Sequence, residues 1–269
     1  TPQLEVFRIL LGREPALSPV IRFYQRLLAG DEDEAAELAD EYLEQHGLVA
    51  LYDEVIVPAL HPAETDRHSG RLHADAERTV REISGAIVED LAERPHAADS
   101  GADAAHGSGS TRPPTERPVL CVPARDEADA LAAGMFAQVL HVQGITAEAV
   151  SQELLVGEIG QRLGREDIPL ICISALPPGA ISHTRYLCKR LGARLPELTI
   201  VVGLWNASEN LGRMRTRLMD SGADRIVTTF AAGAAEVARK KRELAAVASG
   251  RHAEDRGEER IASRPGAPS

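Results

Sequence analysis

The residues best suited to bind a ligand follow the ends of predicted strands in the second half of the chain. Three carboxylates, Asp126, Glu127 and Asp129, come directly after one apolar run, and small or polar residues follow three others. Because ligands of open parallel sheets bind outside the carboxyl ends of the strands, we expect these segments to meet at one edge. The candidate ligand-binding residues are Asp126, Glu127, Asp129, Ser174, Leu176, Gly203, Trp205 and Thr228.

Each candidate also has a purely structural explanation. Acidic side chains in the first turn of a helix favour the positive end of its dipole, which accounts for the three carboxylates without any ligand. The hydroxyl of Ser174 can satisfy loop backbone groups. Trp205, the single tryptophan, can line a pocket or a partner surface, or it can close the core. The sequence alone leaves both explanations open.

Familiar enzyme motifs are missing from the sequence. It contains no nucleophile elbow, no phosphate-binding P-loop and no glycine fingerprint after the first predicted strand. Cys121 and Cys172 fall inside predicted strands, where a thiol behaves as a small hydrophobe. Cys188 and His183 lie on a predicted helix without a recognisable base and orienting partner, so an enzyme that uses either is the weakest hypothesis. We expect no catalytic residue and no metal site.

Residues 118–248 alternate between short apolar runs and helical patterns. Five strands are predicted at residues 119–122, 146–150, 169–173, 198–202 and 225–228, with helices starting near Glu127, Glu153, Ala180, Ser208 and Phe230. Repeated β-α-β steps with short connections predict a doubly wound parallel sheet with helices on both faces. Five strands in this rhythm favour the flavodoxin-like order 2-1-3-4-5.

Residues 1–98 have the pattern of four amphipathic helices, which predicts a small bundle that serves as a cap. The expected helices run from Ser18 to Gly30, from Asp31 through Leu43, from about Leu48 through Leu60 with a kink at Pro58, and over Asp75–Glu93. Residues 99–117, rich in glycine, serine, alanine and proline, predict a flexible linker. The polar residues 249–269 predict a disordered tail.

The composition excludes several classes of function. The chain of 269 residues has no apolar run long enough to cross a bilayer as a helix. With 3% aromatic residues and no basic stripe, it is not a nucleic-acid binder. Three cysteines fit a reducing compartment. The formal net charge of −11 is carried by residues 1–98, while residues 118–246 are close to neutral, which suggests two separately built units.

The layout of a helical cap followed by a flavodoxin-like half resembles cobalamin-binding modules. The segment 23–70 looks like such a cap, with LLAGDEDEAAEL near its start and IVPAL and DRHSG later. Ser174-Ala175-Leu176 matches the serine-x-leucine that lines the nucleotide tail of the cofactor in those modules, and Gly203 falls where they carry glycine. The resemblance implies a cap that closes over the carboxyl edge of the sheet.

The same resemblance breaks down at the cobalt ligand. The family motif D-x-H-x-x-G corresponds here to residues 127–132, EADALA, so that Asp129 stands in place of the histidine that ligates cobalt. The tryptophan of the cap is replaced by Arg67. An aspartate is a poor axial ligand for cobalt compared with imidazole. We therefore expect no cofactor, with cobalamin held without a histidine as the alternative.

A second resemblance concerns autoinducer-2 exporter-like permeases that carry a long soluble C-terminal extension. It is carried by the opening TPQLEVFRILLGREPALSPVIRFYQRLLAGDEDEA and by the later stretches LYDEVIVPAL, VLCVPARDEADALAAGMFAQVL and ICISALPPGAISHTRYLCKRLGARLPELTIVVGLW. It implies a regulatory domain on the cytosolic side of the inner membrane, attached through a preceding membrane region that this chain lacks and coupled through residues 1–20.

Two functions from different classes remain. The first is a non-enzymatic sensor or regulatory domain of a transporter, which binds a small ligand or a protein partner between cap and sheet. The alternative is a corrinoid-binding sensor or carrier that uses no histidine ligand. The sequence leaves open which ligand binds and whether the chain forms a homo-oligomer.

Overall fold

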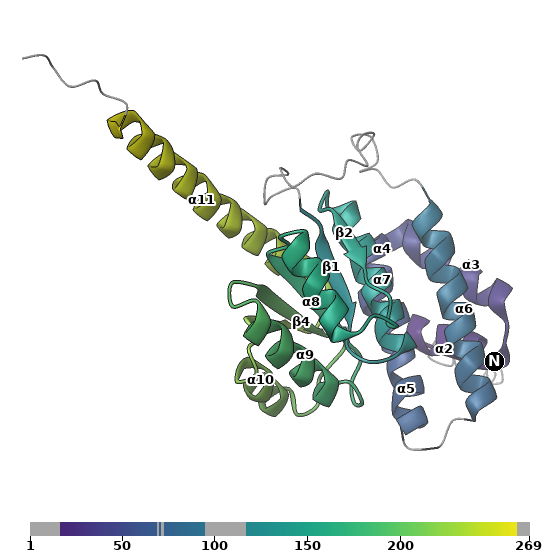
Figure 1. Ribbon diagram of the computed structural model, residues 1–269. Coiled ribbons are helices and arrows are strands. Elements are labelled where there is room, and N and C mark those ends of the chain that lie inside the picture. The colour runs from purple at the N-terminus through teal and green to yellow at the C-terminus, as the bar shows by residue number, and fades with distance from the viewer. Residues whose placement is uncertain (1–16, 69, 71–72, 95–116, 263–269) are drawn as a thin grey trace, which may run out of the picture.

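The computed structural model describes residues 17–68, 70, 73–94 and 117–262 (Figure 1). Helices from the first part of the chain lie beside one face of a parallel sheet, and the last helix, α11, runs away from the body of the molecule. The predicted linker lies almost wholly outside the described residues, as do residues 1–16 of the expected coupling segment. In the described ranges, no helix is both long and apolar enough to span a membrane.

The cap is helical, as the sequence predicts. Its first helix starts at a serine cap, because the Ser18 hydroxyl accepts a hydrogen bond from the Ile21 N–H at 3.4 Å, and it ends at Gly30 in the left-handed conformation (φ 73°). The side chain of Asp31 caps the next helix by accepting from the Glu34 N–H. The cap helices are α2 (Pro19–Ala29), α3 (Glu32–His46), α4 (Leu48–Leu51), α5 (Val57–His68) and α6 (Ala74–Glu93).

A π-helical turn, η1 (Tyr52–Ile56), joins α4 to α5. In it, the Val57 N–H donates to the carbonyl oxygen of Tyr52, five residues back. The turn lies just before Pro58, whose ring has no N–H to donate and crowds the carbonyl of residue 54. The irregularity expected at this proline therefore takes the form of a widened turn within a continuous helical stretch.

The second half forms a five-stranded parallel sheet in the order β2-β1-β3-β4-β5, which confirms the predicted flavodoxin-like topology. Most strand residues are buried, as expected for a sheet covered on both faces. The strands are β1 (Val119–Pro123), β2 (Ala147–Ala149), β3 (Leu170–Ala175), β4 (Thr199–Leu204) and β5 (Arg225–Val227), and the helices are α7 (Glu127–Val142), α8 (Val156–Arg165), α9 (Ile181–Arg194), α10 (Leu211–Met219) and α11 (Phe230–Ala262).

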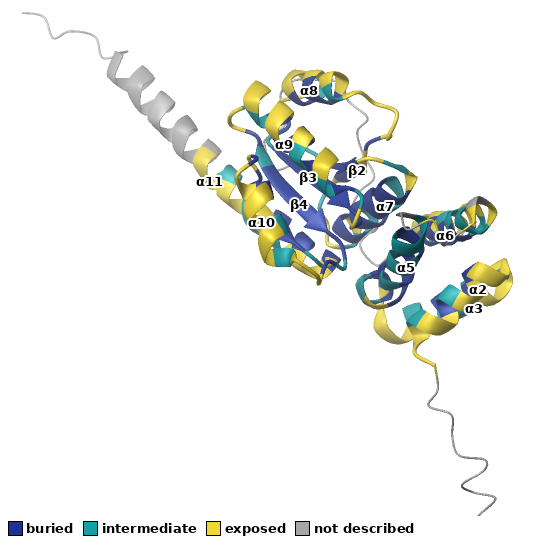
Figure 2. Cartoon of the chain, turned by 90° about the horizontal axis from the view of Figure 1, so that it is seen from below, coloured by how far each residue is buried: buried dark blue, intermediate teal, exposed yellow. Residues whose placement is uncertain are grey.

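Each face of the sheet packs against its own apolar core. One core lies under α8, α9 and α10, which Figure 2 shows together on one side of the buried strands. The other core lies under α7 and α11 and continues without a break into the cap, where it includes Phe23 and Tyr52. The cap is therefore packed onto the sheet half as part of one hydrophobic core.

Polar contacts also fix the cap to the sheet half. The Tyr52 hydroxyl donates to the side-chain oxygen of Gln138 on α7, whose amide nitrogen donates to the carbonyl of Val88 on α6 at 3.0 Å. The carboxylate of Asp53 accepts from the first two N–H groups of α11, at Phe230 (2.5 Å) and Ala231 (2.9 Å). A side chain of the cap thus acts as the N-terminal cap of the last helix.

One prediction for the end of the chain is wrong. The tail was expected to be disordered from residue 249, but α11 continues to Ala262. Residues 249–262 contain three glutamates and three arginines, which are good helix formers, and no proline, and these outnumber the two glycines of the segment. A long helix that begins on the sheet has already been nucleated, so each further residue adds a hydrogen bond at little cost.

Candidate functional site

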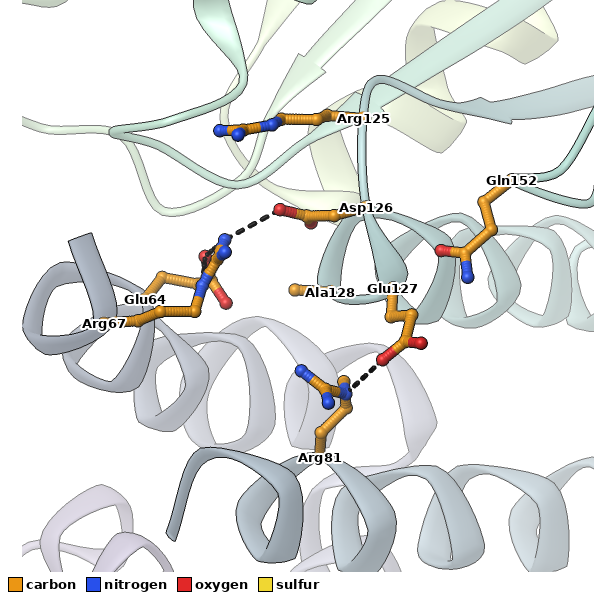
Figure 3. Close-up of a pocket in the computed structure, with 8 residues that line it drawn as sticks. All are labelled: Glu64, Arg67, Arg81, Arg125, Asp126, Glu127, Ala128 and Gln152. Carbon is orange, nitrogen blue, oxygen red and sulfur yellow. Dashed lines mark hydrogen bonds and ion pairs between the residues drawn. The ribbon is translucent and has the colours of Figure 1, made fainter. Parts of the chain in front are cut away.

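A polar cleft lies where the cap meets the carboxyl edge of the sheet. It has a volume of about 320 Å³ and opens between α5 and α6 of the cap and the loop that leads from β1 into α7 (Figure 3). Its lining residues are Glu64, Arg67, Arg81, Arg125, Asp126, Glu127, Ala128 and Gln152. This is the edge that the sequence predicts for a ligand.

Two ion pairs cross the cleft from the cap to the start of α7. The guanidinium of Arg67 donates to Asp126 Oδ2 at 2.7 Å and to Glu64 Oε2 at 2.5 Å. Arg81 Nε lies 2.5 Å from Glu127 Oε2. The Arg67–Asp126 pair is only partly exposed, so solvent screens it less than it screens a pair on the open surface, whereas Glu127 of the second pair is exposed. The cleft is thus closed at its base by charges of opposite sign from the two halves.

Two further lining residues present hydrogen-bond donors that are not used. Arg125 and Gln152 are both exposed, and neither makes a side-chain hydrogen bond or ion pair within the part of the chain that the structure describes. Figure 3 shows them at opposite ends of the cleft, with Asp126 between them. A guanidinium and a carboxamide left free at the rim can bind a carboxylate or phosphate group of a ligand.

Asp129 lies beneath the cleft floor in the first turn of α7. Its side chain is 1% exposed, and its Oδ1 accepts from the Leu176 N–H at 2.7 Å, while Oδ2 has no hydrogen-bond partner. Burial raises the pKa of this carboxyl to about 7; the Leu176 hydrogen bond opposes the rise, and the negative charge of Asp126 adds to it. Asp129 is therefore a proton-binding group in the neutral range at the joint between cap and sheet.

The structure brings only part of the predicted set to the cleft. Asp126 and Glu127 line it, and Asp129 lies below it. Ser174, Leu176 and Gly203 are buried on the side of the sheet that α7 and α11 cover, and they do not line the cleft. Thr228 is half-buried at the end of β5 and is also absent from the lining.

Trp205 is a core residue, so the prediction that it lines a ligand cleft is not supported by its position. Its indole is 1% exposed and packs edge-on against Phe230 at a centroid distance of 4.4 Å and tilted against Phe136 at 5.0 Å. Of the two explanations that the sequence left open for Trp205, its position agrees with the one in which the side chain closes the core.

Several residues that line the cleft are not among the candidates predicted from the sequence. Glu64 and Arg81 come from the cap, and the sequence alone does not show which cap side chains face the sheet. Arg125 and Gln152 follow the first two strands, and this position at the carboxyl edge of the sheet could have identified them as lining residues. Arg67 stands where the resemblance to cobalamin-binding modules places a tryptophan, and it now serves as the main ion-pair partner of Asp126.

Among the described residues, neither the three cysteines nor His183 forms part of a recognisable catalytic group. All three cysteines are unpaired and buried, and burial raises the pKa of Cys188 to about 12, which keeps it as a thiol at neutral pH. The segments that the structure describes contain no cluster of histidine, cysteine, aspartate and glutamate arranged for a metal ion.

Comparisons with known proteins rest on the fold. No protein-family model and no curated protein sequence matches the chain. A monomethylamine corrinoid protein from Methanosarcina barkeri superposes with a TM-score of 0.56 over 81% of this chain and 95% of that chain, at 12% sequence identity. The chain has the fold of a corrinoid protein. The match to a cobalamin-binding protein from Desulfitobacterium hafniense DCB-2 covers 82% of this chain and 97% of that chain, with a TM-score of 0.39 and 13% sequence identity. The match to a methanol:cobalamin methyltransferase complex from Methanosarcina barkeri covers 85% of this chain and 81% of that chain, with a TM-score of 0.38 and 13% sequence identity.

These comparisons support one of the two family resemblances seen in the sequence and not the other. The corrinoid-protein fold, with its helical cap and sheet order, is shown by the first of the three structures. The likeness to exporter-like permeases finds no support in any of the comparisons.

The residues of this chain do not fit a cobalamin held in the manner that the resemblance implies. The ligand position holds Asp129, whose carboxyl is buried and bonded to the Leu176 backbone. The expected tail-binding residues Ser174 and Leu176 are 0% and 2% exposed, and the indole of Trp205 lies directly over Gly203. Neither an axial imidazole nor open space for a nucleotide tail is present among these residues.

Proposed function

We propose that this chain is a non-enzymatic sensor or regulatory domain on a corrinoid-protein fold, and that it binds a small polar ligand with an acidic group in the cleft between cap and sheet. The observation that carries this proposal is that Arg125 and Gln152, at opposite ends of a cleft that both halves of the fold build, make no side-chain hydrogen bond or ion pair with any other described residue. An oxyanion at this rim gains hydrogen bonds from groups that hold no ion pair of their own among the described residues.

The ion pairs below the rim supply the means of response. Arg67 and Arg81 belong to the cap, while Asp126 and Glu127 belong to the first turn of α7. A ligand carboxylate or phosphate competes with Asp126 and Glu127 for these guanidinium groups. Such competition changes the free energy that holds the cap against the sheet, which is the differential interaction that a conformational signal requires.

Calorimetric titration of the purified chain with inorganic phosphate and, separately, with succinate tests the proposal. We expect saturable binding of at least one anion, weakened about tenfold or more in Arg125→Ala, as for the loss of a charge-assisted hydrogen bond. Arg213→Ala, which removes an exposed arginine on α10 far from the cleft lining, is the matched control. No heat with either anion, or equal binding by the Arg125 variant, overturns the proposal.

A corrinoid without histidine ligation is the second candidate, because a protein of known structure that shares this fold is a corrinoid protein. The closed surroundings of Ser174 and Gly203 argue against insertion of a nucleotide tail. Absorption titrations with methylcobalamin and adenosylcobalamin separate the candidates. A saturable spectral change favours the corrinoid, whereas unchanged spectra favour the polar ligand. The attachment to a permease stays a prediction, and fractionation of the native protein with membranes tests it.

A further inference from the structure

The indole of Trp205 fills a slot that two glycines create. A Cβ atom at Gly203 would lie 2.0 Å from indole Cζ2 and 2.3 Å from Cη2, so no other residue fits beneath the ring. A Cβ at Gly233 of α11 would lie 2.9 Å from Phe136 and 3.2 Å from indole Cη2, so this glycine also leaves room for the aromatic rings. The bicyclic ring thus occupies a space that two glycines border and that Phe136 and Phe230 complete.

The slot contains polar atoms that the protein itself leaves unpaired. Ser174 Oγ and Trp205 Nε1 are both buried and have no hydrogen-bond partner among the residues that the structure describes. Ser174 is the register partner of Gly203 on the neighbouring strand, and indole Cε2, which is bonded to Nε1, lies 2.4 Å from the Cβ position at Gly203. Both orphaned groups therefore border the same space. A buried hydroxyl without a partner destabilises the folded state, so packing of the core alone does not explain a serine at this position.

A flat, glycine-walled slot with an unused hydroxyl at its edge has the shape and polarity of a site for a planar heteroaromatic ring. We propose that Trp205 is the internal occupant of such a site, and that its side chain is the determinant that excludes external aromatic bases, including the nucleotide base of a corrinoid. This inference is independent of the polar cleft, because none of the slot residues lines that cleft.

Removal of the indole should make the slot available to a free ligand of the same shape. Apolar cavities opened in protein cores stay dry and take up aromatic molecules that match them. Indole is the direct probe, since it is the missing ring itself. Benzimidazole is the second probe, since its additional ring nitrogen can accept a hydrogen bond from Ser174 Oγ, and we expect it to bind about fivefold to tenfold more tightly than indole.

Thermal unfolding with increasing concentrations of each probe tests the inference. We expect both probes to raise the unfolding midpoint of Trp205→Ala in a saturable manner and to leave the wild type unchanged. Trp205→Phe, which keeps a ring in the slot, is the matched control and should respond to neither. In the double variant with Ser174→Ala, the advantage of benzimidazole over indole should disappear.

Failure of the inference is equally measurable. If folded Trp205→Ala responds to neither probe, or if the wild type responds as strongly, the slot is ordinary core and the inference is wrong. If the variant is isolated unfolded, it is refolded with and without indole and followed by circular dichroism. Recovery only with indole supports an indole-shaped slot, and no recovery overturns it.

Discussion

Replacement of Asp129 by asparagine should make the protein more stable relative to the wild type as the pH rises from acid to alkaline. The carboxyl is buried at the joint between cap and sheet, and one of its oxygens has no hydrogen-bond partner. Its pKa is raised from 3.8 to about 7, mainly by burial. The folded state therefore favours the protonated form, whereas the unfolded chain ionises near its ordinary value.

The sign and size of the effect follow from this difference. Between pH 3.8 and about 7 the unfolded state binds fewer protons than the folded state, so the wild-type free energy of unfolding falls as the pH rises, and above about 7 it levels off. Each pKa unit corresponds to 1.36 kcal/mol, which gives a total near 4 kcal/mol, of which about 3 kcal/mol falls between pH 5 and pH 8. Asparagine does not titrate, so this loss is absent from the variant.

Urea unfolding of wild type and variant at pH 5 and pH 8 measures the effect. The amide keeps an acceptor for the Leu176 N–H, and any constant cost of burying its N–H groups cancels when the two pH values are compared. Asp220→Asn, at the exposed end of α10, controls for the loss of one negative charge. A stability difference between Asp129→Asn and wild type that is the same at both pH values refutes the assignment of a raised pKa to this carboxyl.

Three further substitutions probe how the cap is held. Arg67→Ala removes the ion pair with Asp126, which is worth about 1 kcal/mol. Amide hydrogen exchange in α5 and at the start of α7 should therefore become roughly fivefold faster. The control Arg78→Ala, which breaks an ion pair within α6, should leave exchange in both segments unchanged. Asp53→Ala leaves the first two N–H groups of α11 without acceptors and should cost about 1–2 kcal/mol in urea unfolding, more than Asp53→Asn; equal losses contradict the capping role. Tyr52→Phe leaves a part-buried amide oxygen on α7 unpaired and should cost about 1 kcal/mol in the same assay; no loss contradicts the cap contact.

The parts of the fold that local chemistry determines could be predicted from the sequence. Ser18 and Gly30 mark the ends of α2 because their side chain and backbone satisfy groups within a single turn. The alternation of apolar runs and helices led to the sheet order because right-handed crossovers leave few alternatives. Both features depend on residues close in sequence or on rules that hold for every parallel sheet.

The parts that depend on distant contacts could not be predicted in the same way. The acceptor for the N-terminus of α11 is Asp53, from the cap, and the sequence contains no signal that pairs the two. The burial of Trp205 depends on Gly233 and Phe136, which meet only after the sheet and its helices assemble. The cleft was placed at the correct edge, but half of its charged lining comes from cap residues whose facing direction is a tertiary property.

The hydrogen bonds from the first N–H groups of α11 to Asp53 connect the start of the last helix to the cap. With 33 residues and a rise of 1.5 Å per residue, α11 is about 50 Å long, and Figure 1 shows its later turns extending beyond the body. A tilt of about 5° at its base moves the far end by about 4 Å. The turns of α11 through Leu244 pack against the sheet half and the cap, so a change in that packing that tilted the helix axis would displace its far end most.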